Sequence, residues 1–326
     1  MIIKKKVYTD KPHVFDKPIY EKEAAKAIAA DFNEPYDPDL SSFDFITARM
    51  SANKGLDIVS EPVSEQTKNV KCKDHYVPVK LYAPKDAADR YVLFIHGGGF
   101  ISGKVTDKDA QCRYLAVTSR SVVAAIEYRL SPECMFPGAL EDCVAVLEWI
   151  GTLNPEKIII GGDSAGANLS VATCLKSNVK VDYMFLQYAA LDLETVEETD
   201  YHWSYDFYEM DETQKPVICN RLLRFVKLAK IMKKAYIPEG VDVRNELVSP
   251  LYSARLGELP PVLLIEPEFD YYRPCNEEFA RRIRTQGGQV EEIFYEGMDH
   301  AFMDHLGKVP QVQDALDEIS KRIREL

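Results

Sequence analysis

The stretch "IIIGGDSAGANLSVATCLK", residues 158–176, decides the fold. Its three β-branched residues predict a buried strand, and the part after Asn168 has the spacing of a helix. Between them, residues 162–166 (Gly-Asp-Ser-Ala-Gly) fit the pattern Gly-x-Ser-x-Gly. Flanking glycines let the strand and the helix meet in a sharp turn that strains the central serine and exposes its Oγ. Ser164 is therefore either a nucleophile or the cap of a helix, and the strand–helix context favours the nucleophile.

The chain around this turn alternates between strands and helices from about residue 70 onward. Such alternation predicts an α/β fold with a mostly parallel central sheet and helices on both of its faces. The predicted strands cover residues 69–84, 90–96, 121–130, 156–162, 182–193, 260–270 and 290–297, and the predicted helices cover 112–120, 138–153, 168–176, 276–287 and 309–326.

Two segments lie outside the alternation, and we expect them to form a helical cap over one end of the sheet. The first contains predicted helices over residues 20–32 and 41–54, the latter with an N-cap serine, and the second contains a strong predicted helix over 217–236. We therefore expect contacts between residues 20–50 and 200–235. The predicted domains are residues 1–65 as the N-terminal part of the cap, 66–193 as the first part of the core, 194–245 as the cap insertion and 246–326 as the second part of the core.

The composition excludes several classes of partner. The 326 residues carry a formal net charge of −12, which disfavours nucleic acid and anionic lipid. No segment has the roughly 18 apolar residues of a membrane span, and the N-terminus lacks the apolar region of a signal peptide. Seven scattered cysteines are typical of reduced thiols, so we expect a cytoplasmic protein without stable membrane insertion. A homodimer is compatible with this composition.

A serine hydroxyl is a weak nucleophile until a base removes its proton. Of the six histidines, His300 follows an apolar predicted strand after a short turn, where such a base is expected. His305 is the alternative. The acid that orients the base is expected between the serine and the histidine, and Asp270 ends a predicted strand there. Glu268 and Asp192 are the alternatives to Asp270.

A glycine-rich loop, His96-Gly97-Gly98-Gly99, follows another predicted buried strand. Three glycines in a row expose backbone N–H groups without side chains beside them. Together with the N–H of Ala165, they predict an oxyanion hole with three donors. The loop lacks the spacing of a phosphate-binding loop, and we expect His96 to orient it rather than to transfer protons.

These motifs together resemble the hormone-sensitive-lipase-like family of α/β-hydrolases. The similar segments are "HGGGF" (96–100), "YRLSPE" (128–133), "FPGALEDC" (136–143), "GDSAGAN" (162–168), "SPL" (249–251), "PEFD" (267–270) and "GMDHAF" (297–302). The resemblance covers roughly residues 75–326. It implies the α/β-hydrolase fold with a cap, esterase activity, and a Ser-Asp-His triad without metal or cofactor. It also implies that the oxyanion donors are Gly98, Gly99 and Ala165, and that Asp163 is a structural support.

The sequence thus predicts a serine carboxylesterase that acts on small-molecule, short-chain esters through an acyl-enzyme intermediate. Ser164 would attack the ester, His300 would act as the base, and Asp270 would hold His300. An amidase or peptidase that uses the same triad, and a catalytically silent small-molecule receptor, are the alternatives. A metal hydrolase would instead use Asp299, His300, Asp304 and His305, whose spacing fits no standard ligand motif.

The aromatic residues at positions 201–208 have two interpretations. They line a pocket for the acyl group, or they pack the cap onto the core. On the first interpretation, Tyr205 and Phe207 contact the substrate, together with Phe100 beside the glycine-rich loop.

Overall fold

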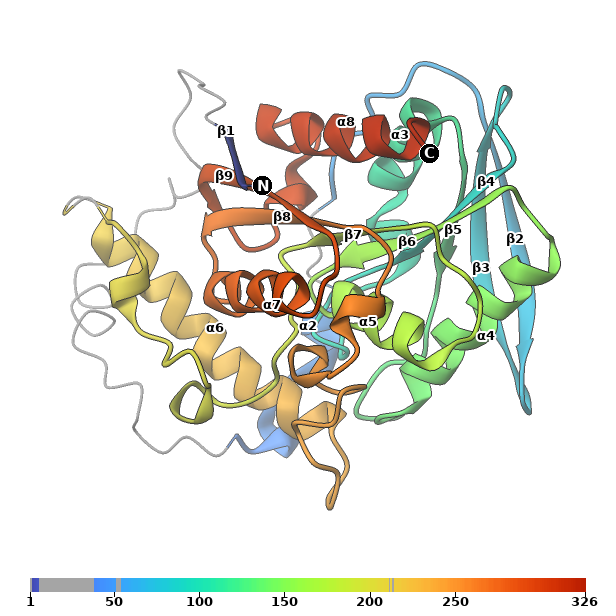
Figure 1. Ribbon diagram of the computed structural model, residues 1–326. Helices are drawn as coiled ribbons and strands as arrows, with labels where there is room; N and C mark the ends of the chain where they lie inside the picture. Colours follow the sequence, from blue (N-terminus) through green and yellow to red (C-terminus); the bar gives the residue numbers. More distant parts are fainter. Residues whose placement is uncertain (1, 6–37, 51–53, 211, 213) are drawn as a thin grey trace.

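The structure is a computed structural model that describes residues 2–5, 38–50, 54–210, 212 and 214–326 (Figure 1). Its described strands form a nine-stranded sheet in the order β1-β9-β8-β7-β6-β4-β5-β3-β2. The helix predicted over residues 20–32 lies outside the described residues. The strands are β1 (Ile2–Lys5), β2 (Val63–Cys72), β3 (His75–Pro84), β4 (Arg90–Ile95), β5 (Val122–Ile126), β6 (Lys157–Asp163), β7 (Tyr183–Gln187), β8 (Val262–Phe269) and β9 (Val290–Asp299).

The sheet is mostly parallel, as the alternation predicted. Strands β4 to β9 pair in parallel, β1 adds a parallel strand beside β9, and the hairpin β2–β3 joins antiparallel through β5. Strand β7 is shorter than predicted because Tyr188, directly after it, has a positive φ of 39° that ends the extended conformation. The carboxyl ends of the parallel strands therefore meet along one edge of the sheet.

Helices cover both faces of this sheet (Figure 1). Helices α3 (Asp109–Ser119) and α8 (Pro310–Arg324) lie on one face, and α4 (Gly138–Thr152), α5 (Ala165–Lys176) and α7 (Arg273–Thr285) lie on the other. Successive strand residues point to opposite faces, so Ile159 packs under α3 and α8 whereas Ile160 packs under α4 and α5. The sheet is thus the middle layer between two hydrophobic cores.

The N-terminal part of the chain differs in detail from the sequence prediction. Residues 1–65 were assigned to the cap, but β1 lies at the edge of the main sheet. Its four residues, "IIKK", are too short to carry a strand signal. The helix predicted over 41–54 is divided into a 3-10 turn, η1 (Leu40–Ser42), and α2 (Phe45–Met50). The residue before α2, Asp44, accepts the N–H of Thr47 (2.9 Å), so an aspartate and not a serine begins this helix.

The described parts of the two predicted cap segments contact each other. The long helix α6 (Lys215–Tyr236) lies beside α2 and η1, across the strand ends (Figure 1). Leu40, Phe43 and Phe45 pack against the cluster that contains Ile218 and Leu222 of α6. We propose that these segments form one cap. The remaining short helices are η2 (Val105–Asp107), η3 (Val196–Glu198), η4 (Tyr205–Phe207), η5 (Pro250–Tyr252), η6 (Leu256–Glu258) and η7 (Phe302–His305).

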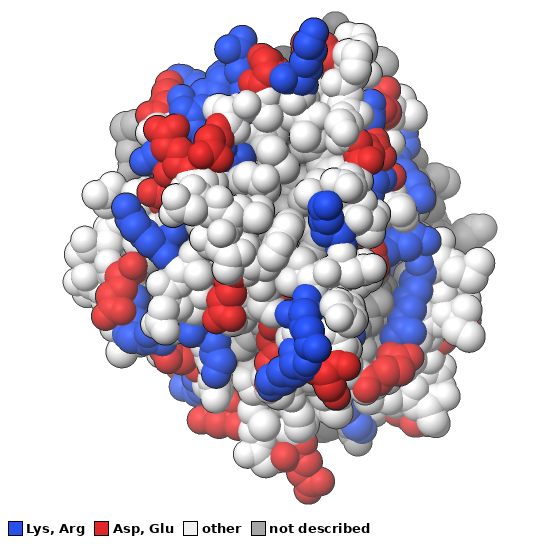
Figure 2. Space-filling model, turned by 90° about the vertical axis from the view of Figure 1, so that its right-hand side faces the viewer, with Lys and Arg blue, Asp and Glu red and all other residues white. Residues whose placement is uncertain are grey.

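The charge on the surface and the character of the helices can be compared with what the composition predicts. On the face shown in Figure 2, Lys and Arg side chains are interspersed with Asp and Glu side chains. Within the described residues, no helix combines the length and the apolar character that a bilayer crossing requires.

Candidate active site

Ser164 occupies the sharp turn between β6 and α5. Its backbone dihedrals, φ 52° and ψ −116°, are strained for a residue with a side chain, and its N–H donates to the carbonyl of Gln187 (2.9 Å). The turn needs glycine beside the serine, because a Cβ at Gly166 would lie 2.0 Å from the carbonyl oxygen of Ile95. The strand, the turn and the helix are those predicted from residues 158–176.

The structure brings His300 and Asp270 to this serine. His300 Nε2 lies 2.9 Å from Ser164 Oγ, and His300 Nδ1 lies 2.8 Å from Asp270 Oδ2. Since a carboxylate only accepts, Nδ1 carries the ring proton, and Nε2 is free to accept the serine proton. All three side chains are buried, and Asp270 also accepts the N–H of Tyr272 (2.7 Å).

The other two candidate acids are engaged elsewhere. Glu268 accepts the N–H of Gly297 (2.7 Å), so it supports the end of β9 before His300 rather than the ring itself. Asp192 accepts the hydroxyl of Tyr252 (3.0 Å). Of the three acids predicted from the sequence, Asp270 is thus the one that contacts His300.

The residues of the metal-hydrolase alternative do not converge on one point. Asp299 forms an ion pair with Arg221 of α6, and Asp304 forms one with Lys108 (2.5 Å). His300 is held between Ser164 and Asp270, and His305 ends η7. Within the described residues, the donor atoms of these four side chains do not gather at the spacing that one shared ion requires.

The glycine-rich loop lies against the nucleophile turn. Gly98 and Gly99 have φ values of 125° and 62°, and a Cβ at Gly98 would lie 2.1 Å from the carbonyl oxygen of Ser102. Among the described residues, the N–H groups of Gly98, Gly99 and Ala165 donate no hydrogen bond. These three donors are therefore available to a bound oxygen.

His96 orients this loop, as expected. Its ring stacks on Tyr128 with the centroids 4.3 Å apart, and its Nδ1 lies 2.8 Å from the carbonyl of Gly97. The Tyr128 hydroxyl donates to the carbonyl of His96 (2.9 Å). Burial lowers the pKa of His96, which keeps the ring neutral.

A buried lysine that the sequence pattern does not indicate, Lys108, lies beside the turn that carries Ser164. Lys108 Nζ donates to Asp163 Oδ2 (2.9 Å) and to Asp304 Oδ1 (2.5 Å). The second oxygen of Asp163 accepts the N–H of Gly97 (2.8 Å), which connects the lysine to the glycine-rich loop. Burial opposes the charge of Lys108, but the two carboxylates outweigh it and raise the pKa of the lysine. Within "DKDAQ", residues 107–111, Lys108 looks like an exposed side chain, so no local pattern indicates its burial.

Ser164 and His300 face a cavity of about 490 Å³ under the proposed cap. Its floor contains Ser164, His300 and the glycine-rich loop, and its roof comes from α6 and the N-terminal segment. The Phe225 ring lies 4.5 Å from the His300 ring, centroid to centroid. The roof residues, none of which is among the residues predicted from the sequence, are Phe43, Ala48, Arg224, Phe225, Leu228 and Met232.

The aromatic residues predicted to contact substrate do not line this cavity. Phe100 is fully buried and stacks on Tyr236 with the centroids 3.9 Å apart. The Tyr205 hydroxyl donates to the carbonyl of Cys219 (3.1 Å), and Phe207 packs within the cap. Positions 201–208 instead pack the cap onto the core, the second of the two interpretations: Tyr208, for example, donates to the carbonyl of Asp270 (2.7 Å).

A family model described as the alpha/beta hydrolase fold matches residues 92–304, which include the glycine-rich loop, Ser164, Asp270 and His300. The chain belongs to this family. The predicted α/β-hydrolase fold and the resemblance drawn from the motifs are therefore confirmed.

Other α/β-hydrolases resemble this chain over most of their length. An arylesterase of Saccharolobus solfataricus is 28% identical over 280 residues, which cover 81% of this chain and 86% of the relative. An acetyl esterase of Salmonella dublin is 26% identical over 255 residues, 74% of each chain. The crystal structure of a thermophilic carboxylesterase cloned from a metagenomic library matches with a TM-score of 0.71 and 29% identity, and covers 86% of this chain and 92% of that one.

Proposed function

We propose that this protein is a serine carboxylesterase that hydrolyses short-chain esters of small molecules through an acyl-enzyme intermediate. One observation carries the proposal: His300 connects Ser164 (2.9 Å) to Asp270 (2.8 Å) at the floor of a cavity. This is the connectivity that activates a serine for attack on a carbonyl carbon. The arylesterase, acetyl esterase and carboxylesterase relatives support ester rather than other carbonyl substrates.

In the proposed first half-reaction, His300 Nε2 accepts the Ser164 proton as Oγ attacks the acyl carbon. Asp270 holds the ring and stabilises the imidazolium that forms. The negative charge develops on the former carbonyl oxygen, where the N–H groups of Gly98, Gly99 and Ala165 are its proposed donors. Those groups stabilise the oxyanion more than the ground-state carbonyl, which lowers the barrier.

The first half-reaction ends when the protonated His300 donates its proton to the leaving alkoxide and the ester C–O bond breaks, which leaves the acyl group on Ser164 Oγ. The proposed second half-reaction is the hydrolysis of this acyl-enzyme. Water then enters, and His300 removes a proton from it as it attacks the acyl-enzyme. The same oxyanion donors stabilise the second tetrahedral intermediate. Its collapse returns the proton to Ser164 Oγ and releases the carboxylic acid.

The size of the cavity supports small substrates. The acyl and alcohol groups would share its volume of about 490 Å³, and Phe225, Leu228 and Met232 line it together with Ser164. Apolar roof residues favour the burial of an alkyl or aryl group, while their proximity limits its length. We therefore propose a preference for acetyl to butyryl esters over long-chain esters.

The test is hydrolysis of p-nitrophenyl esters from acetyl to palmitoyl by wild type and by Ser164→Ala, with matched anilides in parallel. We expect wild type to cleave the short esters fastest and Ser164→Ala to lose the activity by several orders of magnitude. If the anilides were cleaved faster than the esters, the proposed activity would be that of an amidase and not of an esterase. Failure on every ester, with folded protein, would contradict the proposal.

A further inference from the structure

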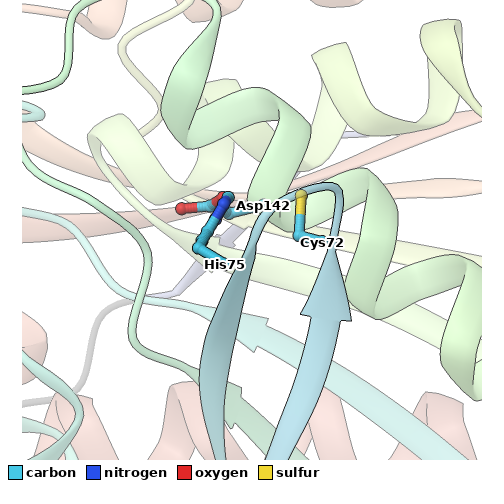
Figure 3. Close-up of side chains that lie close together, drawn as sticks. All are labelled: Cys72, His75 and Asp142. Atoms are coloured by element: carbon cyan, nitrogen blue, oxygen red, sulfur yellow. The ribbon is translucent and has the colours of Figure 1, made fainter.

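A second group of reactive side chains lies outside the cavity, at the end of the β2–β3 hairpin. Cys72 is the last residue of β2, and His75 is the first residue of β3. The two residues face each other in the strand register, across the turn made by Lys73 and Asp74. Asp142 of α4 completes the group, and Figure 3 shows the three side chains gathered between the hairpin and this helix. None of the three lines the cavity that contains Ser164.

The donor atoms of these residues are close enough to share an ion. The Cys72 sulfur, a His75 ring nitrogen and an Asp142 oxygen all lie within 4.8 Å of one another, and the shortest separation, Nε2 to Oδ1, is 2.7 Å. Neighbouring ligands of a tetrahedral zinc ion lie about 3.3–3.6 Å apart, given metal–ligand distances of about 2.0–2.3 Å. Small side-chain movements would thus bring the three atoms to ligand spacing. We propose that Cys72, His75 and Asp142 bind one Zn²⁺ ion.

The donor set selects a class of metal. A thiolate and an imidazole are the ligands that zinc prefers, whereas Mg²⁺ and Ca²⁺ take oxygen ligands. Three protein ligands leave a fourth tetrahedral position for water. His75 is the partly exposed member of the group, and an ion can therefore reach the buried Cys72 and Asp142 past its ring.

Arg129 holds the carboxylate of Asp142 in place through an ion pair and hydrogen bonds. Arg129 donates its backbone N–H to Asp142 Oδ2 (3.0 Å) and its Nε to the same oxygen (2.9 Å). Ligating carboxylates in metal sites are commonly fixed by such outer hydrogen bonds. Oδ1 also accepts from Arg129 Nη2 (2.8 Å), yet it is the oxygen that faces His75.

Charge also fits a divalent cation. With Cys72 as a thiolate, the negative groups are Cys72, Asp142, Asp74 and Glu141, and the positive ones are Arg129 and Lys73, which pairs with Glu141 (2.6 Å). A divalent ion would balance this surplus of two negative charges.

The bound ion would join the hairpin to α4, since two of its ligands come from the hairpin and one from the helix. Its effect is therefore on stability, and the inference does not depend on the proposed esterase activity. Binding to the folded chain should raise the urea midpoint in proportion to the logarithm of the free zinc concentration.

The test is a zinc titration of chelator-treated, full-length protein in competition with a chromogenic chelator. We expect one ion per chain in wild type, and an affinity at least roughly tenfold lower in Cys72→Ser and in His75→Ala. Cys174→Ser and His202→Ala are the matched controls, because both residues lie away from the hairpin, and both variants should keep the wild-type affinity. Cobalt should give a thiolate-to-metal absorption band in wild type and Cys174→Ser but not in Cys72→Ser.

Two outcomes would overturn the proposal. One is that wild type takes no zinc from the competitor. The other is that zinc binds with unchanged affinity to Cys72→Ser, which would place the ion elsewhere. Ester hydrolysis and the urea midpoint of each metal-free variant report its folding. Asp142→Asn is a poorer probe, because it leaves the Arg129 guanidinium without its carboxylate and is expected to destabilise the fold.

Discussion

The molecule holds two groups of the same chemical types, Ser164-His300-Asp270 under the cap and Cys72-His75-Asp142 at the hairpin. In the first, the ring uses one nitrogen for the serine and the other for the acid. In the second, the His75 ring uses Nε2 for Asp142 and faces Asp74 with Nδ1 (3.4 Å), and the Cys72 thiol donates to the carbonyl of Glu141 (3.6 Å). Of these two rings, only that of His300 connects a hydroxyl group to an acid.

The comparison shows that a nucleophile, a histidine and an acid do not form a triad merely by lying close together. The two ring nitrogens must contact the nucleophile and the acid, one each. Asp142 is neutralised by Arg129, so it has less charge to offer an imidazolium than Asp270 has. Ser164 faces a cavity, while Cys72 is buried with a raised pKa, which keeps it a thiol. The first group is thus arranged for proton transfer and the second for holding two elements, or an ion, together.

The largest expected effect is a loss of kcat that distinguishes His300 from His75. His300→Ala removes the proposed base and should lower kcat for a short ester by roughly 10⁴–10⁶-fold. His75→Ala should leave kcat within a few-fold of wild type in metal-free buffer, since His75 does not line the cavity. Steady-state kinetics on p-nitrophenyl acetate measure both. Equal losses in the two folded variants would break the comparison.

The second-largest expected effect is a loss of kcat that distinguishes Asp270 from Glu268, the acids on either side of Phe269. Asp270→Asn would turn the His300 ring to the wrong tautomer and should cost roughly 10⁴-fold in kcat. Glu268→Gln keeps an oxygen that can accept the Gly297 N–H, so its loss should be far smaller. Steady-state kinetics on p-nitrophenyl acetate measure the kcat of both variants. Near-wild-type activity in Asp270→Asn together with an inactive Glu268→Gln would reassign the acid.

A smaller effect is expected at Lys108, which acts on the site through other residues. Lys108→Met removes the cation that holds Asp163, and through it the N–H of Gly97. A slightly displaced glycine-rich loop should lower kcat by up to about 100-fold with little change in KM. The kcat is measured per active site by titration with a serine-directed phosphonate. If kcat per site is unchanged and only the urea midpoint falls, Lys108 has a purely structural role.

The core of the fold was predictable because its signals are local. The apolar, β-branched residues before Ser164 predict a buried strand. The turn needs its glycines because a Cβ at either of them would lie less than 3 Å from the carbonyl oxygen of Ile95. The candidate triad was predictable for the same reason, since parallel strands end at one edge and each residue follows a strand. The sequence favours Asp270 but leaves Glu268 as an alternative, because their different partners depend on the path of the chain at the end of β8.

The roof of the cavity could not be predicted, because it depends on tertiary placement. Phe225 and Leu228 lie on a helix whose pattern shows an apolar face but not what it covers. Phe100 was expected to contact substrate, yet it stacks on Tyr236 at the end of the same helix. The ion pair of Lys108 with Asp304 joins residues far apart in the chain, and neither residue type signals burial.

The smallest expected effect concerns a third buried acid, Glu266 of β8. Asp142 has Arg129 and Asp270 has His300, but within the described residues Glu266 Oε1 has no hydrogen-bond partner. Burial, assisted by the charge of Glu292, raises the pKa of Glu266 well above its usual value. The folded chain therefore keeps this proton at a pH where the unfolded chain has lost it.

The sign of the resulting pH dependence follows from this proton. Above pH 4.5, the ordinary pKa of the group, the folded state binds more protons than the unfolded state, so Glu266 lowers stability as the pH rises toward its folded pKa. Each unit of pKa difference is worth about 1.4 kcal/mol. Glu266→Gln, which does not titrate, should therefore gain in urea midpoint over wild type as the pH is raised from 5 to 8. If the gain in urea midpoint were the same at every pH from 5 to 8, the pKa of Glu266 would not be raised by folding.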